Sequence, residues 1–294
     1  MSALITAALL LLLVLLPSPA PTLTLMDQTG LEVTLPVPPR RIVSLVPSVT
    51  EVLFAIAAQD LLVGVTDFCD YPPEARRKPS VGGMVAPNLE TILMLKPDIV
   101  IATPAGNREE TVVQLQRLRI PVYLVNPTTM GDVMDLIARL GALTEHRIPA
   151  ARLVTTLDTR IQTVVGRVTP LGRPRVLYVL WPEPVIVPGR GALVSELIAL
   201  AGGDSVTADG AEGYPRYSLE AAVARAPQVI ILADRGAGLD TLAREKWGRL
   251  RSLPAVKAER LFSVDGNLMH HYGPRVVDGL ELLARLIHPE AFKK

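Results

Sequence analysis

Short apolar runs and longer amphipathic segments alternate along most of this chain. An apolar run predicts a buried strand, and apolar residues three or four positions apart predict a helix that buries one face. After a hairpin predicted at residues 23–35, strands are expected at 41–46, 62–66, 98–102 and 122–125, and helices at 49–58, 89–95, 108–118 and 132–143. Ser48, with Glu51 three residues later, predicts a capping box for the first of these helices.

The second half of the chain repeats this rhythm. Strands are expected at 175–180, 228–232 and 261–264, and helices at 193–201, 219–225, 239–253 and 275–287. Residues 265–273 lack either pattern and are expected to form a loop. Strands that alternate with helices favour parallel sheets covered by helices on both faces.

A long helical segment, Glu145–Pro170, lies between the two arrays. Its apolar residues share one helix face: Leu153, Leu157, Ile161, Val164, Val165 and Val168. A helix of about 20 residues spans about 30 Å, the width of a small domain. The pattern therefore predicts a bilobed α/β protein, and an ordinary crossover helix inside one large domain is the alternative. The predicted parts are an N-terminal lobe at 23–144, an interlobe helix at 145–170 and a C-terminal lobe at 171–294.

One short motif occurs once in each half. Asn88-Leu89-Glu90 is followed by six residues, Pro97 and an apolar strand, and Ser218-Leu219-Glu220 leads to Pro227 at the same spacing. Chance similarity is the alternative, because proline is common after helices. The helix dipole accounts for an acidic residue at either helix start, worth about 0.3–1 kcal/mol. The matched positions of Glu90 and Glu220 further suit a partner with two symmetric basic pockets.

The N-terminal residues carry an export pattern. Residues 3–16 form an unbroken apolar block, followed by Pro17-Ser18-Pro19-Ala20. The block is shorter than the roughly 20 residues that a membrane span needs, and its length fits the apolar region of a secretory signal. We therefore expect residues 1–22 to be a cleaved signal peptide, with an uncleaved N-terminal anchor as the alternative.

Composition excludes several functional classes. The 294 residues include 30 basic and 29 acidic side chains, a net charge of +1 without a long basic run, so no nucleic-acid surface is expected. The single cysteine, Cys69, excludes an internal disulfide and a multi-cysteine zinc site. Cys69 has no histidine beside it in the sequence, so a lowered thiol pKa is not expected.

Aromatic residues gather in the loops where a ligand is expected. In open parallel sheets, ligands bind beyond the carboxyl ends of the strands. Only twelve residues of the chain are aromatic, and six lie in such loops: Phe68, Tyr71, Trp181, Tyr214, Tyr217 and Tyr272. This bias favours a wide, partly apolar ligand held between the lobes. The alternative, for about half of these rings, is that they cap the apolar cores.

Catalytic motifs are absent from the sequence. It contains no G-x-S-x-G, H-E-x-x-H or P-loop pattern, so no enzymatic activity and no cofactor or metal site of its own are expected. His270 and His271 are two of only four histidines. Adjacent residues of an extended segment point to opposite sides, which makes a poor bidentate metal clamp. One of them could still bind the metal of a bound ligand, and a plain polar loop is the alternative.

An ordered set of short motifs resembles the cobalamin-type substrate-binding proteins of ABC importers. These motifs are RIVSLVPSVTE at 41–51, VGV at 63–65, DYPP at 70–73, NLE at 88–90, KPD at 96–98, AGG at 201–203, YPR at 214–216, SLE at 218–220 and GPR at 273–275. The resemblance implies two Rossmann-like lobes with parallel sheets, joined by one long helix, with the ligand in the cleft. It implies an exported, periplasmic or extracytoplasmic protein, which we expect to be a monomer.

The resemblance also implies particular roles for particular residues. Glu90 and Glu220 are expected to meet arginines of the membrane permease. Ligand contacts are expected from Phe68, Met84, Thr103, Trp181, Tyr214, Asn267, His270 and His271. The best-known cobalamin-binding protein has more aromatic residues at the positions that correspond to Met84 and Thr103. Haem or a ferric siderophore is therefore the alternative ligand to a corrinoid. For haem or a siderophore, His270, His271 or Tyr217 would contact the iron.

Overall fold

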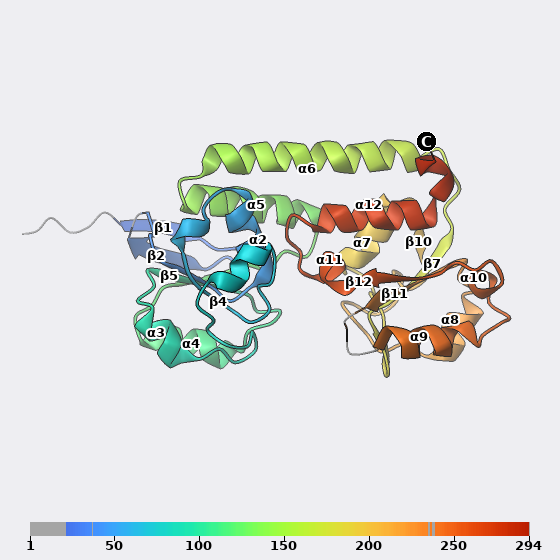
Figure 1. Ribbon diagram of the computed structural model, residues 1–294, viewed down its shortest axis with the longest axis horizontal. Helices are drawn as coiled ribbons and strands as arrows, with labels where there is room; N and C mark the ends of the chain where they lie inside the picture. Colours follow the sequence, from blue (N-terminus) through green and yellow to red (C-terminus); the bar gives the residue numbers. More distant parts are fainter. Residues whose placement is uncertain (1–21, 37, 235, 237–238, 294) are drawn as a thin grey trace, which may run out of the picture.

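Two α/β lobes lie side by side beneath one long helix (Figure 1). The computed structural model describes residues 22–36, 38–234, 236 and 239–293. The first lobe has a parallel sheet in the order β4-β3-β5-β6, formed by β3 (Ile42–Ser44), β4 (Leu62–Val65), β5 (Ile99–Ala102) and β6 (Val122–Leu124). The second has a parallel sheet in the order β10-β7-β11-β12, formed by β7 (Arg175–Val179), β10 (Asp204–Ser205), β11 (Val229–Asp234) and β12 (Leu261–Asp265).

Helices cover both faces of each sheet, as the alternating pattern predicts. The first lobe contains α2 (Pro47–Ala55), α3 (Leu89–Met94), α4 (Glu109–Arg117) and α5 (Met130–Leu143). The second contains α7 (Leu193–Leu200), α8 (Leu219–Ala224), α9 (Leu239–Gly248), α10 (Pro254–Lys257), α11 (Gly266–His270) and α12 (Val276–Ile287). Figure 1 shows α5 and α12 on the side of the long helix, and α3, α4, α8 and α9 on the opposite side.

Two small antiparallel sheets complete the fold. β1 (Thr22–Met26) pairs with β2 (Glu32–Pro36), as the hairpin pattern predicts, and β8 (Trp181–Pro182) pairs with β9 (Val185–Ile186). No helix in the described ranges is both long enough and apolar enough to cross a membrane. Apart from Thr22, the predicted export signal at 1–22 lies outside the described residues.

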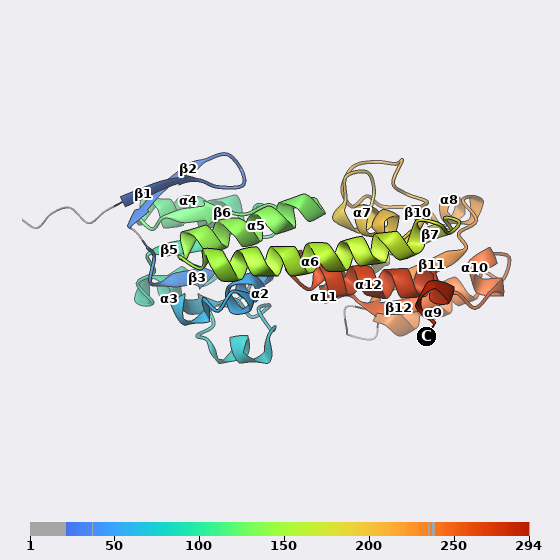
Figure 2. The same ribbon diagram turned by 90° about the horizontal axis from the view of Figure 1, so that it is seen from above.

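The long helix is α6 (Arg147–Val168), which confirms the helix predicted at 145–170. Both views show α6 running along the two lobes (Figures 1 and 2). Of the apolar face expected from the sequence, Leu157, Ile161, Val164 and Val168 are buried and the remaining two residues are partly buried. The helix therefore packs along its whole length and is not a solvent-exposed linker.

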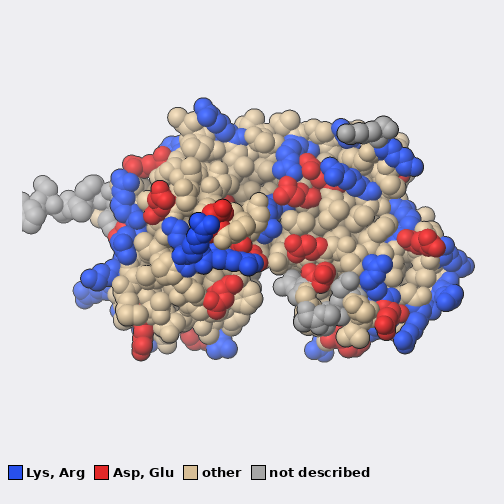
Figure 3. All heavy atoms as spheres, viewed as in Figure 1, with Lys and Arg blue, Asp and Glu red and all other residues tan. Residues whose placement is uncertain are grey.

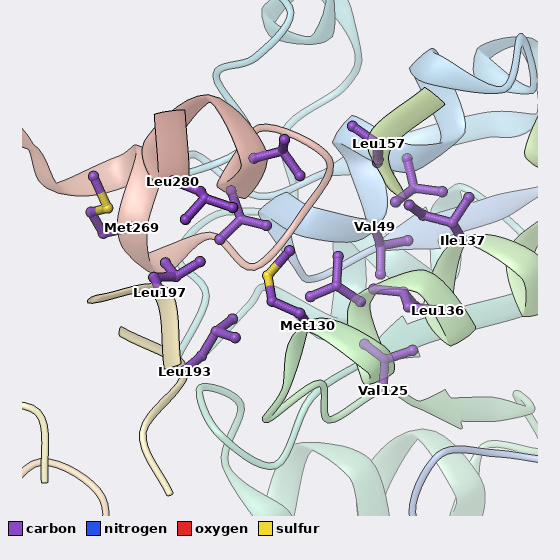
Figure 4. Close-up of a cluster of buried hydrophobic side chains, with 14 of the residues drawn as sticks. Val49, Val125, Met130, Leu136, Ile137, Leu157, Leu193, Leu197, Met269 and Leu280 are labelled. Carbon is purple, nitrogen blue, oxygen red and sulfur yellow. The ribbon is translucent and has the colours of Figure 1, made fainter. Parts of the chain in front are cut away.

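One apolar core continues from the first lobe through α6 into the second. The same cluster of buried side chains contains residues of both lobes, among them Val49, Leu136, Leu157, Leu197 and Leu280. Figure 4 shows Met130, from the start of α5, between side chains of α7 and those of the first lobe. Because packed interiors deform little, this continuity fixes the separation of the two lobes.

Polar contacts reinforce the same junction. Glu196 of α7 accepts a hydrogen bond from the backbone N–H of Met130 at 3.0 Å. Arg160 of α6 forms ion pairs with Asp278 and Glu281 of α12, with 2.8 Å between Arg160 Nε and Glu281 Oε1. The hydrogen bond from Arg160 lowers the pKa of the Glu281 carboxyl.

Three local predictions are wrong. Ser48 and Glu51 form no capping box, because α2 begins at Pro47 and Val46 is its N-cap, without a side-chain cap. The helix expected at 239–253 ends at Gly248, and α10 begins separately at Pro254. The loop expected at 265–273 begins with α11, whose N-cap Asp265 accepts a hydrogen bond from the backbone N–H of Asn267.

Ile161→Ala should destabilise both lobes together, because this side chain is buried in their shared core. The free energy of unfolding should fall by about 2–5 kcal/mol, the usual range for truncating a buried aliphatic side chain. Urea denaturation, followed by circular dichroism and by tryptophan fluorescence, should give the same lower midpoint with both signals. Thr159→Ala, on the exposed face of the same helix, is the control and should change little. Separate transitions, only one of them shifted, would contradict a shared core.

Candidate functional site

The candidate site is a cavity of about 430 Å³ between the two lobes. Figure 3 shows the molecular surface indented between the lobes, on the side away from α6. The first-lobe residues that line the cavity follow the carboxyl ends of the strands, as expected for an open parallel sheet. The lining consists of Val46, Pro47, Ser48, Phe68, Met84, Val85, Thr103, Ala105, Gly106, Asn126, Pro127, Tyr214, His270, His271 and Tyr272.

Lysine, arginine, aspartate and glutamate are all absent from the described residues that line this cavity. Its surface combines aliphatic and aromatic groups with a few neutral polar ones. Asn126 is partly exposed, and its side-chain amide has no hydrogen-bond partner among the described residues. Phe68 is 57% exposed, although burial would normally be favoured for a side chain of this kind. The arrangement suits a large, largely uncharged molecule that covers apolar surface and forms several hydrogen bonds.

An aromatic wall closes the cavity on the side of the second lobe. His270 Nε2 lies 3.0 Å from the hydroxyl of Tyr178, and its ring stands edge-on to Tyr178 and Tyr214, with 5.7 Å between ring centroids in each pair. The hydroxyls of Tyr214 and Tyr272 are hydrogen-bonded to each other. Burial raises the pKa of both tyrosines, so each remains a neutral phenol at physiological pH.

Six of the eight ligand contacts expected from the sequence line this cavity: Phe68, Met84, Thr103, Tyr214, His270 and His271. The other two, Trp181 and Asn267, do not line it. Trp181 lies in β8, where its indole N–H donates to the carbonyl of Glu183. Asn267 lies in the first turn of α11.

Several lining residues were not predicted as contacts. Asn126 and Pro127 lie just beyond the carboxyl end of β6, separated from it by one residue, so the rule on strand carboxyl ends could have found them. Tyr272 stands out in the sequence as one of the loop aromatics. Val85 and Gly106 also lie in loops that follow strands of the first sheet, but neither residue type by itself indicates a ligand contact.

A buried polar cluster connects the lobes beside the cavity. We call Glu51, His271 and Arg275 the interlobe polar cluster. Oε1 of Glu51 lies 2.7 Å from Nη2 of Arg275 and 3.2 Å from Nδ1 of His271. The Glu51 side chain is 2% exposed, and the guanidinium of Arg275 lies 3.9 Å from the ring centroid of Tyr71. Glu51 therefore belongs to a tertiary ion pair and not to a helix cap.

The repeated motif forms the same structure twice. Asn88 caps α3 by accepting from the N–H of Thr91 at 3.0 Å, and Ser218 caps α8 by accepting from the N–H of Ala221 at the same distance. After each helix, one residue has a left-handed backbone, Lys96 with φ 44° and Ala226 with φ 45°.

Each repeated helix is also held at its carboxyl end by an arginine. Arg41 donates to the carbonyls of Leu95 and Lys96, and Arg175 donates to those of Arg225 and Ala226. These matched hydrogen bonds support a structural duplication. In both copies the glutamate, Glu90 or Glu220, is exposed, and neither forms an ion pair with another described residue.

Potential metal ligands and reactive side chains are few and scattered in the described part of the chain. No group of three or more His, Cys, Asp or Glu side chains there could hold a metal ion. Cys69 is buried, and this burial raises the pKa of its thiol, in agreement with the sequence-based expectation. His270 and His271 do not share a ligand direction, since one contacts the aromatic wall and the other Glu51.

Comparison with known proteins places this architecture in a family. The family described as periplasmic binding protein matches residues 42–268. A vitamin B12-binding protein of Vibrio cholerae is 30% identical over 246 residues, which cover 84% of this chain and 88% of the relative. An uncharacterized ABC transporter substrate-binding lipoprotein of Bacillus subtilis is 29% identical over 278 residues, 92% of this chain and 87% of the relative.

Solved structures share the bilobed fold. The periplasmic vitamin B12 binding protein of Vibrio cholerae has a TM-score of 0.76 at 28% identity, over 87% of this chain and 99% of the other. The apo form of a periplasmic haem-binding protein from Roseiflexus has a TM-score of 0.77 at 26% identity, over 86% and 99%. The sequence and the fold agree: the chain belongs to the periplasmic binding protein family, as a substrate-binding protein of an ABC transporter.

Proposed function

We propose that this protein binds a corrinoid, such as cobalamin, in the interlobe cleft and delivers it to the permease of an ABC importer. In this proposal the protein is exported, holds no cofactor of its own and catalyses no reaction. The observation that carries the choice of ligand is the lack of charged side chains among the described residues lining the cavity. A corrinoid carries neutral amide groups around its rim, which need hydrogen-bond partners and not counter-charges.

Individual residues have complementary roles in this proposal. Phe68, Met84 and Tyr214 offer apolar surface to the macrocycle, and Ser48, Thr103 and Asn126 offer neutral polar groups to its amides. The similarity to vitamin B12-binding proteins supports the same ligand class. Because the shared core fixes the lobes, the cleft exists before the ligand arrives, and binding does not have to supply energy for closure.

Haem or a ferric siderophore is the second candidate, favoured by the similar fold of a haem-binding protein. Haem carries two carboxylates, and buried carboxylates usually require cationic partners. Neither Lys nor Arg lines the described cavity. Tyr217 is one of the residues expected to contact the iron of haem or a siderophore. It packs against the core of the second lobe and does not line the cavity.

Glu90 and Glu220 are the proposed contacts with the permease. Both are exposed, both lie in the first turn of a firmly held short helix, and neither carboxylate is neutralised by a described neighbour. Figure 1 shows their helices, α3 and α8, on the side of the molecule away from α6, one in each lobe. Two fixed carboxylates in matched positions complement two equivalent basic sites on a partner with twofold symmetry.

Phe68→Ala should weaken corrinoid binding by about 10–100-fold. Its exposed ring would be covered by the ligand, and covering such a side chain contributes about 1.5–3 kcal/mol. Isothermal titration calorimetry with cyanocobalamin measures the change. Ile148→Ala, which removes an exposed apolar side chain of α6 outside the cavity, is the matched control and should bind like the wild type. If the wild-type protein binds hemin but no corrinoid, the proposed ligand is wrong.

Glu90→Ala combined with Glu220→Ala should abolish permease docking while leaving the affinity for cyanocobalamin unchanged. The reason is the loss of both exposed carboxylates that would meet basic residues. Binding to the purified transporter in detergent measures docking, which should also weaken with added salt in the wild type. Glu110→Ala combined with Glu259→Ala removes one exposed carboxylate from each lobe and serves as the control. Undiminished docking of the Glu90/Glu220 double variant would overturn the assignment.

A further inference from the structure

We propose that the turn of the N-terminal hairpin, through Gln28, positions Asn126 to recognise a carboxamide on the rim of the bound ligand. Asn126 is the specificity-determining residue in this inference, and Gln28 is a positioning residue outside the cavity lining. The inference rests on the proposed function, because a corrinoid carries such amides. It gives a role in binding to β1 and β2, which precede the part of the chain that the family matches, residues 42–268.

The hairpin lies next to the outer strand of the first sheet. Figure 2 shows β1 and β2 at the edge of the first lobe, beside β6 and α5. At the turn, the backbone N–H of Gln28 donates to the carbonyl of Leu124 at 3.1 Å, and the carboxylate of Asp27 accepts from the N–H of Leu124 at 3.3 Å. Leu124 is the last residue of β6, and Asn126 follows two positions later. The turn therefore lies beside a loop that lines the cavity.

The side chain of Gln28 holds this loop in place. Its Oε1 accepts from the backbone N–H of Asn126 at 3.1 Å, and its Nε2 donates to the carbonyl of Asp132 at 3.1 Å and to the carboxylate of Asp135 at 3.2 Å. Because one end of the carboxamide faces a donor and the other end faces two acceptors, only one orientation of the amide satisfies all three contacts. Gln28 thus connects Asn126 to the first two turns of α5.

The turn that carries Gln28 is itself held by hydrogen bonds. Asp27 is 3% exposed, and its Oδ1 accepts from the backbone N–H and from the hydroxyl of Thr29, each at 2.8 Å. Arg139 of α5 donates to the carbonyl of Met26 at 2.9 Å. These contacts fix the backbone on either side of Gln28, so its side chain extends from a defined position.

Asn126 is the residue that this support places at the cavity. The preceding residue, Val125, is fully buried and donates its N–H to the carbonyl of Ala102 at 2.8 Å, so the loop leaves the sheet at a fixed point. The backbone N–H of Asn126 is taken by Gln28, while its side-chain amide bonds to no other residue that the structure describes. Asn126 is also the only carboxamide among the described residues of the lining, so its amide is available for a ligand.

A fixed carboxamide can distinguish an amide from a carboxylate. Asn126 can donate to the carbonyl oxygen of a ligand amide and accept from its NH2 group, which gives two hydrogen bonds. A carboxylate in the same place only accepts, so Oδ1 of Asn126 would face another acceptor. Leaving a polar group unpaired in a covered site is costly, and this cost makes such a pair selective. The selection requires support from behind, because a freely moving side chain could turn away from the wrong group.

The test compares cyanocobalamin with derivatives in which one rim amide at a time is hydrolysed to a carboxylate, by isothermal titration calorimetry. For each rim position, the ratio of the two affinities measures the preference for an amide. Asn126→Ala should lower this preference at one position by about 3–10-fold, the contribution of one neutral hydrogen bond, and leave the other positions unchanged. Gln28→Met, which keeps the length of the side chain without its polar groups, should lower the preference at the same position by about 2–5-fold.

A double variant and a control separate positioning from a general effect on the fold. Asn126→Ala combined with Gln28→Met should equal Asn126→Ala alone, because the two residues act through one contact with the ligand. Thr24→Ala removes the hydroxyl contact between Thr24 and Thr34 on the exposed face of the same hairpin, and it should match the wild type. All the substituted side chains are exposed or partly exposed, so each variant should fold, which circular dichroism checks.

Three results would overturn the inference. An amide preference in Asn126→Ala that equals that of the wild type at every rim position excludes the role of Asn126. No loss or an equal loss at every position in Gln28→Met, or losses that add in the double variant, excludes the positioning role of Gln28. Either result leaves the proposed function standing, because the wild type still binds cyanocobalamin. If the wild type does not bind cyanocobalamin, the proposed function fails and this inference fails with it.

Discussion

The buried face of α6 packs into a single apolar core together with both sheets, and the position of every cleft residue depends on this packing. Leu157, Ile161 and Val164 share one cluster with side chains of α5, α7 and α12. The lobes cannot separate without exposing that core and breaking the ion pair between Glu51 and Arg275. The cleft is thus a fixed feature of the fold and not the product of a closing hinge.

The cavity and the helices α3 and α8 both lie on the side of the molecule away from α6, but their chemistry differs. The cavity between the lobes is lined by apolar and neutral polar groups, and the exposed ends of α3 and α8 carry unpaired carboxylates. A neutral cavity suits a large ligand that is held by burial and hydrogen bonds. The carboxylates suit a partner recognised by charge. The rigid core would keep both at a constant separation, so that a protein loaded with ligand presents the same docking surface as an empty one.

Much of this arrangement is readable from the sequence, because local patterns determine it. The apolar face of 145–170, the alternation of strands and helices, and the repeated motif with Glu90 and Glu220 all depend on residues close together in the chain. The capping-box prediction is wrong because the contact of Glu51 is made with a residue far away in the chain. Glu51 has the spacing of a capping box, yet its partner Arg275 is 224 positions away. Trp181 remains a predicted ligand contact, but it lies in the small β8–β9 sheet and is not among the residues that line the cavity.

The proposed ligand of the interlobe cleft is a corrinoid. The most direct measurement is the absorption spectrum, with the mass of the extracted ligand, of the protein purified from its own host without added ligand. If the ligand is a corrinoid, the spectrum will show its visible bands at about one molecule per chain, and the released mass will contain cobalt. A Soret band with an iron porphyrin mass, or an iron-loaded siderophore, would contradict it.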